Sequence, residues 1–272
     1  MSSFYTSLNG LRNAETDLGV IAHNIANAET SGFKKSSAQF ADIVANGSAS
    51  NPRLARGIGA TVSSITQNFS LGAVEQTGRS LDLAIDGDGF FAVRNAETAE
   101  VFFTRNGNFR IDGNGVLTDA TGARLQLTPT DAAGVVTAPG TIVDGQVPVT
   151  NGAGAELANV TIERNGVVLA AYADGSVEAV GRLALANFVA PDGLKATGSS
   201  RWEATGMSGA PDFTVPTVGR AGQILSGALE RSNVDLAEEM VALITAQRNF
   251  QANAKAIDTA TQISQTIINL RS

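Results

Sequence analysis

The sequence predicts an α+β fold, with N- and C-terminal helices paired as a coiled-coil-like stalk and a central, mainly antiparallel β domain between them in the chain. At both ends, apolar residues recur in alternating steps of four and three, which is typical of helices that pack along one another. From about residue 61 to residue 228 the apolar spacing changes to two, and turn sequences rich in Gly, Asn and Asp follow each run. This pattern is typical of strands in a meander.

The C-terminal stripe lies within residues 232–271. Ser232, Asn233 and Asp235 offer side-chain oxygens to cap the first turn of the helix, and no Pro or Gly interrupts it afterwards. Three polar residues, at positions 247, 261 and 264, share the stripe. Its apolar members are Leu236, Met240, Leu243, Phe250, Ala254, Ile257 and Ile268, and Ile244, Ile263, Ile267 and Leu270 widen the apolar face.

The N-terminal stripe lies within residues 3–28, with Glu15 as its polar member. Its apolar members are Phe4, Leu8, Leu11, Leu18, Ala22 and Ile25. A fully buried Leu or Phe contributes roughly 1.5 to 3 kcal/mol to stability, so two stripes left in water would forfeit many kcal/mol. One interpretation is an ordinary antiparallel helix pair packed on the domain between. The other is a helical stalk whose outer apolar faces are buried against copies of the same chain.

The β region reads as two meanders joined by residues 128–158. The first has strands near 81–85, 90–93, 101–105, 108–111, 116–118 and 125–127, and the second has strands between 160 and 188. Asn106-Gly107 and Asn165-Gly166 each separate two apolar runs, which favours two-residue type I′ hairpins. The joining residues are rich in Gly, Pro and Ala, so we expect at most short edge strands there.

These patterns divide the chain into a discontinuous helical assembly domain, residues 1–45 with 229–272, and a central β domain, residues 46–228. Residues 46–60, rich in Asn, Gly, Ser and Ala, are expected to form a loop. Residues 128–158 form a connecting region rich in Gly, Pro and Ala.

Composition excludes several classes of function. A net charge of −7 argues against nucleic acid as a partner, because such binding depends on Lys and Arg at the phosphates. No apolar run approaches the roughly 20 residues that a bilayer requires, so we expect no membrane insertion. The chain has no Cys, and we expect secretion without a cleavable signal peptide because the N-terminus lacks a basic region followed by an apolar core.

Residue patterns that carry enzymatic chemistry are missing from the sequence. His23 is the single His, which excludes His-based triads and two-His metal sites. The stretches at 86–89 and 112–115 fit turns better than calcium loops, because the EF-hand spacing of ligands is missing. We therefore expect no catalytic residues, no metal and no cofactor, and a protein that is not an enzyme.

Several ordered motifs resemble those of the axial proteins of the bacterial flagellum, the rod and hook subunits. Residues 24–34 (NIANAETSGFK) resemble the N-terminal signature of this family, with Asn24, Asn27, Gly32, Phe33 and Lys34 as the motif residues. Residues 78–91 (GRSLDLAIDGDGFF) are similar to its first core motif. Residues 103–109 (FTRNGNF), 185–188 (LANF), 232–235 (SNVD) and 246–253 (AQRNFQAN) are similar to later ones.

Within the family, the two chain ends look most like those of the flagellar hook protein. The resemblance implies a structural subunit that is exported by the flagellar type III apparatus and polymerises into the tubular hook joining rod to filament. Its partners would be copies of itself, neighbouring axial proteins (rod, cap and hook-filament junction) and the export apparatus, and its location the extracellular hook of the flagellum. Many hook subunits carry an additional outer β domain in the middle of the chain, and residues 128–158 are too few to form one. A distal-rod subunit of the basal body, which also lacks that domain, is therefore an alternative. A secreted, non-enzymatic β-domain binding module that uses Trp202 and Tyr172 is a second alternative.

Overall fold

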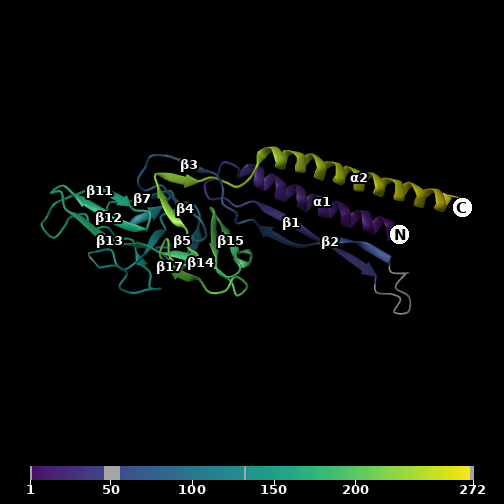
Figure 1. The fold of residues 1–272 in the computed structure, drawn as a ribbon. Coiled ribbons are helices and arrows are strands. Elements are labelled where there is room, and N and C mark those ends of the chain that lie inside the picture. Colours follow the sequence, from purple (N-terminus) through teal and green to yellow (C-terminus); the bar gives the residue numbers. More distant parts are fainter. Residues whose placement is uncertain (1, 46–55, 132, 270–272) are drawn as a thin grey trace. The chain divides into compact units, whose positions relative to one another are not determined.

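The computed structural model describes residues 2–45, 56–131 and 133–269, and the described chain is α+β. It divides into two compact units (Figure 1). Unit 1 comprises residues 1–28, 35–68 and 234–272, and unit 2 comprises residues 29–34 and 69–233. The predicted boundary at residues 45/46 differs from this division, because residues 46–68 group with the helices and residues 229–233 group with the β unit.

Unit 1 holds the two terminal helices and a long hairpin. Its elements are α1 (Ser2–Ala26), β1 (Ser36–Ala45), β2 (Arg56–Gln67) and α2 (Leu236–Asn269). The strands pair antiparallel from Ser36 opposite Gln67 to Ala45 opposite Arg56. Residues 56–60, predicted as loop, therefore belong to a strand, and residues 46–55 of that predicted loop lie outside the described residues. Asp235 caps α2, because its Oδ1 accepts hydrogen bonds from the N–H groups of Ala237 (2.8 Å) and Glu238 (3.2 Å).

The helices α1 and α2 pack along one another in antiparallel directions. Asn24 near the end of α1 donates to Glu239 near the start of α2. Gly10 permits close approach farther along, since a Cβ there would lie 2.6 Å from Asn253 Oδ1. The predicted N-terminal seam is out of phase with this contact. The buried side of α1 steps through Gly10, Ala14, Asp17, Ile21 and Asn24, one residue before Leu11, Glu15, Leu18, Ala22 and Ile25 of the predicted stripe.

Unit 2 is built from short antiparallel strands (Figure 1). Its strands are β3 (Val74–Gln76), β4 (Leu83–Asp86), β5 (Phe90–Arg94), β6 (Val101–Thr104), β7 (Phe109–Ile111), β8 (Leu117–Asp119), β9 (Arg124–Thr128), β10 (Val143–Asp144), β11 (Leu157–Ile162), β12 (Val167–Tyr172), β13 (Val177–Leu183), β14 (Leu185–Asn187), β15 (Lys195–Gly198), β16 (Arg201–Glu203), β17 (Asp212–Thr214), β18 (Gln223–Ser226) and β19 (Ala228–Glu230), with a 3₁₀ turn η2 (Pro191–Gly193). The central antiparallel β domain that the sequence predicts is thus confirmed.

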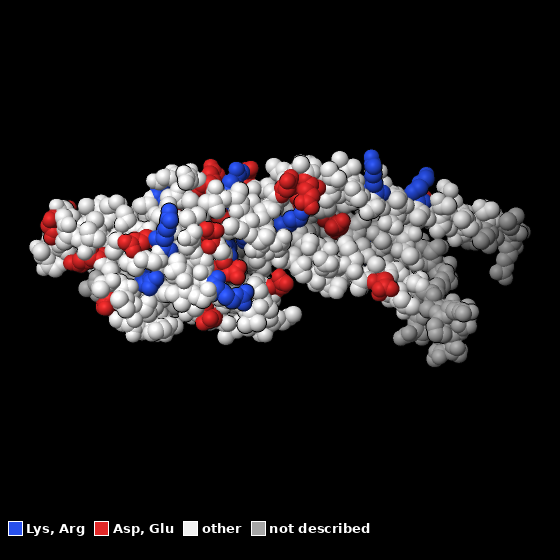
Figure 2. Space-filling model, in the orientation of Figure 1, with Lys and Arg blue, Asp and Glu red and all other residues white. Residues whose placement is uncertain are grey.

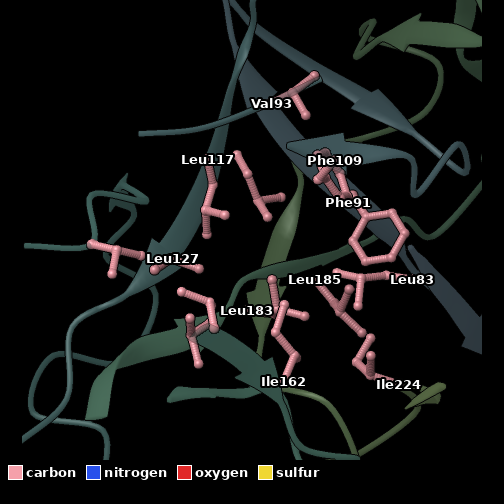
Figure 3. Packing of buried hydrophobic residues seen from close by; sticks show 14 of the residues in the cluster. Leu83, Phe91, Val93, Phe109, Leu117, Leu127, Ile162, Leu183, Leu185 and Ile224 are labelled. Carbon is pink, nitrogen blue, oxygen red and sulfur yellow. The ribbon is translucent and has the colours of Figure 1, made fainter. Parts of the chain in front are cut away.

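The main sheet of unit 2 runs in the order β11-β12-β13-β9-β5-β6-β16-β15, so β9 joins the two predicted meanders. Two pairs, β18 with β4 and β19 with β3, tie the last strands of the unit to its first ones. The core contains apolar side chains from the main sheet and from the β18-β4 pair, and Figure 3 shows these side chains pointing toward one another. Leu83, Phe91, Phe109 and Leu185 are completely buried in it.

The hairpin at Asn165-Gly166 forms as predicted, but with a different turn. Strands β11 and β12 pair on either side of it. Only Gly166 of the two residues takes a positive φ, +83°, whereas a type I′ turn needs positive φ at both. The Gly166 N–H donates to the Glu163 carbonyl at 2.9 Å. This is a type I turn followed by a left-handed Gly, the next most common hairpin connection.

The prediction of a hairpin at Asn106-Gly107 is wrong. Strand β6 pairs with β5 and β16, and β7 pairs with β8, so the two flanking strands do not pair with each other. Gly107 instead passes against strand β4, where its carbonyl accepts from the Leu83 N–H at 3.0 Å. A Cβ at residue 107 would overlap the Leu83 carbonyl oxygen. Gly is needed here for a close approach between two chain segments and not for a turn.

Candidate functional site

Helix α2 exposes an apolar stripe along the side that α1 leaves uncovered. Leu236, Met240 and Ile244 follow one another at helical spacing and Val241 adjoins them; we call these four residues the outer stripe. Between 43% and 66% of each remains accessible to solvent. Apolar stripes of this kind usually mark contacts with another protein surface.

Other predicted assembly residues lie closer to the helix pair. Leu243, Phe250 and Ile257 are half-buried beside Glu239, Ala246 and Asn253, which form the side of α2 nearest α1. The remaining predicted members have varied exposure: Ala254, Leu8, Leu11, Leu18 and Ile25 are half-buried, Phe4 and Ala22 are exposed, and the side chains of Ile267 and Ile268 lie outside the described part. The predicted residues therefore do not form one continuous seam.

A buried polar network between α1, α2 and β1 was missed by the sequence analysis. The side chain of Asn24 donates to Glu239 Oε2 (3.1 Å) and to the Ser36 carbonyl (2.8 Å), and it accepts from the Ser36 N–H. Lys35 pairs with Glu239 at 2.8 Å. These groups border a cavity of about 290 Å³ together with Asp17. Burial, and then the charge of Glu239, raise the pKa of Asp17.

The seven-residue spacing of Gly10, Asp17 and Asn24 is the signal that could have revealed this network. Polar or small residues repeating every seven positions can mark the contact between two helices as well as apolar ones do. The apolar residues alone place the seam one position farther along α1 than the side that α2 covers. A buried polar pair of this kind fixes which residues of two helices lie opposite each other.

The residues of the N-terminal motif have several local roles. Asn24 belongs to the network above, and Asn27 donates to the His23 carbonyl at 2.9 Å at the end of α1. Gly32 takes a positive φ of +68° and lies against Arg105 and Asn106, where a Cβ would not fit. Phe33 is buried, and the ammonium group of Lys34 pairs with Glu230 inside unit 2.

Among residues 2–45, 56–131 and 133–269, no group of three His, Cys, Asp or Glu side chains is placed to hold a metal ion. Acidic and basic side chains are interspersed on the face shown in Figure 2. Trp202 and Tyr172, on which the binding-module alternative depended, are both buried. In the described helices, no segment is long and apolar enough to span a bilayer.

Three protein-family models match successive parts of the chain. Residues 4–34 match the model described as flagella basal body rod protein. Residues 84–170 match the flagellar hook protein FlgE/F/G D1 domain. Residues 225–270 match the C-terminal model of the flagellar basal body rod FlgEFG proteins. The first and last models fall on the two terminal helices, and the middle one falls on the first part of the β unit.

Curated relatives match along the full chain. The flagellar basal-body rod protein FlgG of Bacillus subtilis is 35% identical over 282 residues, covering 100% of this chain and 99% of the relative. FlgG of Buchnera aphidicola from Acyrthosiphon pisum is 31% identical, covering 98% of this chain and 99% of that protein. The flagellar hook protein FlgE of Escherichia coli is 28% identical over 409 residues, covering 99% and 100%. The chain therefore belongs to the flagellar axial family of rod and hook proteins.

Proposed function

We propose that this chain is a structural subunit of the distal rod of the bacterial flagellar basal body. The observation that carries the proposal is the agreement in both identity and length with FlgG. The match to the Bacillus subtilis protein extends over 282 residues at 35% identity. The match to the Escherichia coli hook protein needs 409 positions at 28% identity to accommodate this chain of 272 residues. The hook protein thus contains a large segment that has no counterpart here.

This proposal reverses the preference for a hook subunit that the chain ends suggested. Both terminal helices fall within the matches to rod and hook proteins alike, because the C-terminal family model covers FlgE, FlgF and FlgG together and the Escherichia coli hook protein aligns with 99% of this chain. Likeness at the ends therefore separates the subfamilies poorly. Chain length is the more informative feature, and it favours the rod.

The subunits polymerise, in this proposal, through the terminal helices of unit 1. The outer stripe of α2 supports this role, since Met240 is 47% and Val241 66% exposed in the single chain. Covering such side chains with a second copy removes apolar surface from water, which is favourable by roughly 25 cal/mol per Å². The partners are further copies of the chain and neighbouring axial proteins, and the helix pair acts as the coiled-coil-like stalk that the sequence predicts.

We propose that delivery to the flagellum occurs through the flagellar type III apparatus. The support is the membership in the family of flagellar rod and hook proteins.

Localisation in the native bacterium tests the rod proposal. A peptide tag inserted at the exposed turn beside Asn114 leaves the core strands intact. Gold labelling or cryo-electron microscopy of isolated hook-basal bodies should place the tag in the rod, and deletion of the gene should leave a shortened rod without a hook. A tag found along the curved segment outside the cell would contradict the rod proposal and restore the hook alternative.

A further inference from the structure

Residues from two sequence motifs and one residue just before a third meet at a buried ion cluster in unit 2, whose role the assembly proposal leaves unexplained. Lys34 ends the N-terminal motif, Arg105 lies in the motif at residues 103–109, and Glu230 comes shortly before the motif at residues 232–235. Lys34 Nζ is 2.5 Å from Glu230 Oε1, and an Arg105 guanidinium nitrogen is 3.3 Å from Glu230 Oε2. The side chains of Lys34 and Glu230 are 0% exposed and that of Arg105 is 4% exposed.

Each member of the cluster also bonds to backbone, Lys34 and Glu230 to residues 70–72 and Arg105 to residues 85–87. Lys34 donates to the Ser70 carbonyl at 2.6 Å. Arg105 donates to the carbonyls of Gly87 (2.9 Å) and Ile85 (3.5 Å), and its guanidinium lies 5.2 Å from the centre of the Phe90 ring. Glu230 accepts a further hydrogen bond from the Gly72 N–H at 3.0 Å. The cluster thus connects the aromatic core to the segments at the edge of unit 2.

Two further segments, residues 29–34 and 230–233, lie where the chain first enters unit 2 and where it finally leaves it. They contact each other directly, because the Gly32 N–H donates to the Glu230 carbonyl at 2.8 Å. Arg231 forms an ion pair with Glu29, and its N–H donates to the Ala73 carbonyl at 2.8 Å. The entering and leaving segments are therefore joined to each other as well as to the β strands.

The charge balance of the cluster makes Glu230 its essential member. Two cations share one carboxylate. Burial is the main influence on both cations and lowers the pKa of Lys34 and of Arg105, and the charge of Glu230 opposes that effect in each. An isolated buried charge is very costly, so a folded unit 2 without Glu230 would contain two buried cations with no counter-charge inside the cluster.

We propose that Lys34, Arg105 and Glu230 form an internal clamp that holds the entering and leaving segments of the chain to the β core, so that neither segment opens unless unit 2 unfolds. Buried ion pairs are weak evidence for stability, since apolar side chains of similar size often do as well. This cluster instead favours one conformation of the chain over its alternatives, because all three charges are paired only when three segments that are distant in sequence lie together.

Stability measurements on the full chain test the charge balance. The single Trp, Trp202, is buried in unit 2 and reports its unfolding by fluorescence. Glu230→Gln should lower the folded-to-unfolded ratio by about 100-fold or more, and Lys34→Met by about tenfold, because Glu230 then keeps Arg105 as its partner. The double variant Lys34→Met/Glu230→Gln should be more stable than Glu230→Gln alone, since it removes one of the two buried cations that lack a counter-charge. The control Glu203→Gln breaks an exposed pair with Lys195 and should have little effect.

A double variant that loses stability by the sum of the two single losses would overturn the charge-balance argument. If Glu230→Gln does not fold, a folded double variant supports the proposal and an unfolded one counts against it.

Amide hydrogen exchange in the unaltered chain tests the clamp itself. The N–H groups of Gly32 and Gly72 bond to Glu230, whereas that of Leu117 bonds to the Gly145 carbonyl within the core. We expect all three to exchange at similar rates, through global unfolding of unit 2. In Lys34→Met, Gly32 and Gly72 should exchange at least tenfold faster than Leu117. Exchange of Gly32 and Gly72 that is 100-fold faster than that of Leu117 in the unaltered chain would show that the segments open on their own, and would overturn the proposal.

Discussion

Units 1 and 2 bury different kinds of residue. In unit 2, large apolar side chains such as Leu83, Phe91 and Leu125 are completely covered. In unit 1, the most buried residues of the helix pair are polar or small, among them Asn24, Glu239 and Ala246, and the large apolar side chains of α2 remain partly exposed. Unit 2 thus completes its own core, whereas unit 1 keeps much of its apolar surface available to other molecules.

This difference separates two meanings of an apolar pattern in sequence. A strand that alternates apolar and polar residues buries its apolar face within its own domain. A terminal helix with a wide apolar face can instead divide that face between a partner in the chain and a partner in another subunit. In a single chain, we therefore expect unit 2 to have a larger free energy of unfolding than unit 1.

The largest expected effect is on the core of unit 2. Leu83→Ala should reduce the free energy of unfolding of this unit by about 3 to 4 kcal/mol, because it leaves a cavity at a completely buried site. Met240→Ala in the outer stripe should change the stability of the soluble subunit by less than about 0.5 kcal/mol. Urea unfolding followed by Trp202 fluorescence and by helical circular dichroism measures both. Equal losses for the two variants would remove the contrast between the units.

Polymerisation should respond in the opposite way. Met240→Asp or Ile244→Asp places an unpaired charge in the proposed contact between subunits, at a cost of about 3 kcal/mol, which raises the critical concentration for polymerisation about 100-fold. The fluorescence-detected melting of unit 2 should not change. Val189→Asp is the matched control, since Val189 is 89% exposed in unit 2. If the control blocks polymerisation to the same extent, the contact is not specific to the terminal helices.

Acid should weaken unit 2 through Asp144. Burial raises the pKa of this carboxyl, but hydrogen bonds from Gln126, Arg94 and Arg124 outweigh burial and lower the pKa to about 2. The folded-state pKa lies below the unfolded one, so this contribution is complete above about pH 4 and is lost as the pH falls toward 2. Because the site is partly open to solvent, we expect it to amount to about 1 kcal/mol.

Urea unfolding at pH 5 and at pH 2.5 measures this contribution as the difference between the unaltered chain and Asp144→Asn. Asp144→Asn should be less stable than the unaltered chain at pH 5, and the difference should be clearly smaller at pH 2.5, which lies between the folded pKa of about 2 and the ordinary carboxyl value. A gap that is the same at both pH values would show that the charge of Asp144 does not stabilise the fold.

The smallest effect is expected at Asp17 in unit 1. Burial and the charge of Glu239 raise its pKa, so ionisation at neutral pH opposes folding, and the penalty disappears as the pH falls below the ordinary carboxyl range. Asp17→Asn should stabilise the helix pair at pH 7 by a few tenths of a kcal/mol, because the site is partly solvated. Helical circular dichroism in urea measures this change. A loss of stability at pH 7 would mean that the carboxylate has a favourable partner.

Local sequence patterns predicted the helices and strands of this protein better than they predicted which helices and strands contact each other. The spacing of apolar residues predicted both terminal helices and the hairpin at Asn165-Gly166. It failed at Asn106-Gly107, because the need for Gly came from contact with the distant Leu83. The strand β1 was also missed, since its alternation is weak and its pairing with β2 crosses residues 46–55, which were predicted as a loop.

The candidate site was predicted in part. Leu236, Met240 and Ile244 of the outer stripe could be identified because helical spacing alone places them on one face. The network around Asn24 and Glu239 could not, because it depends on two helices that are far apart in sequence. The choice between rod and hook depends on a segment that the hook protein has in addition to the residues matched here. The local pattern of the residues present therefore could not predict it.

Hydrogen exchange of the soluble subunit and of its polymer tests most directly whether unit 1 is completed by other copies. Peptides that cover residues 236–257 of α2 should gain at least 100-fold protection on polymerisation, while those that cover β4, β5 and β9 in unit 2 should not change. Equal protection of α2 in both states would contradict the account, because the helix pair would then be complete in a single chain.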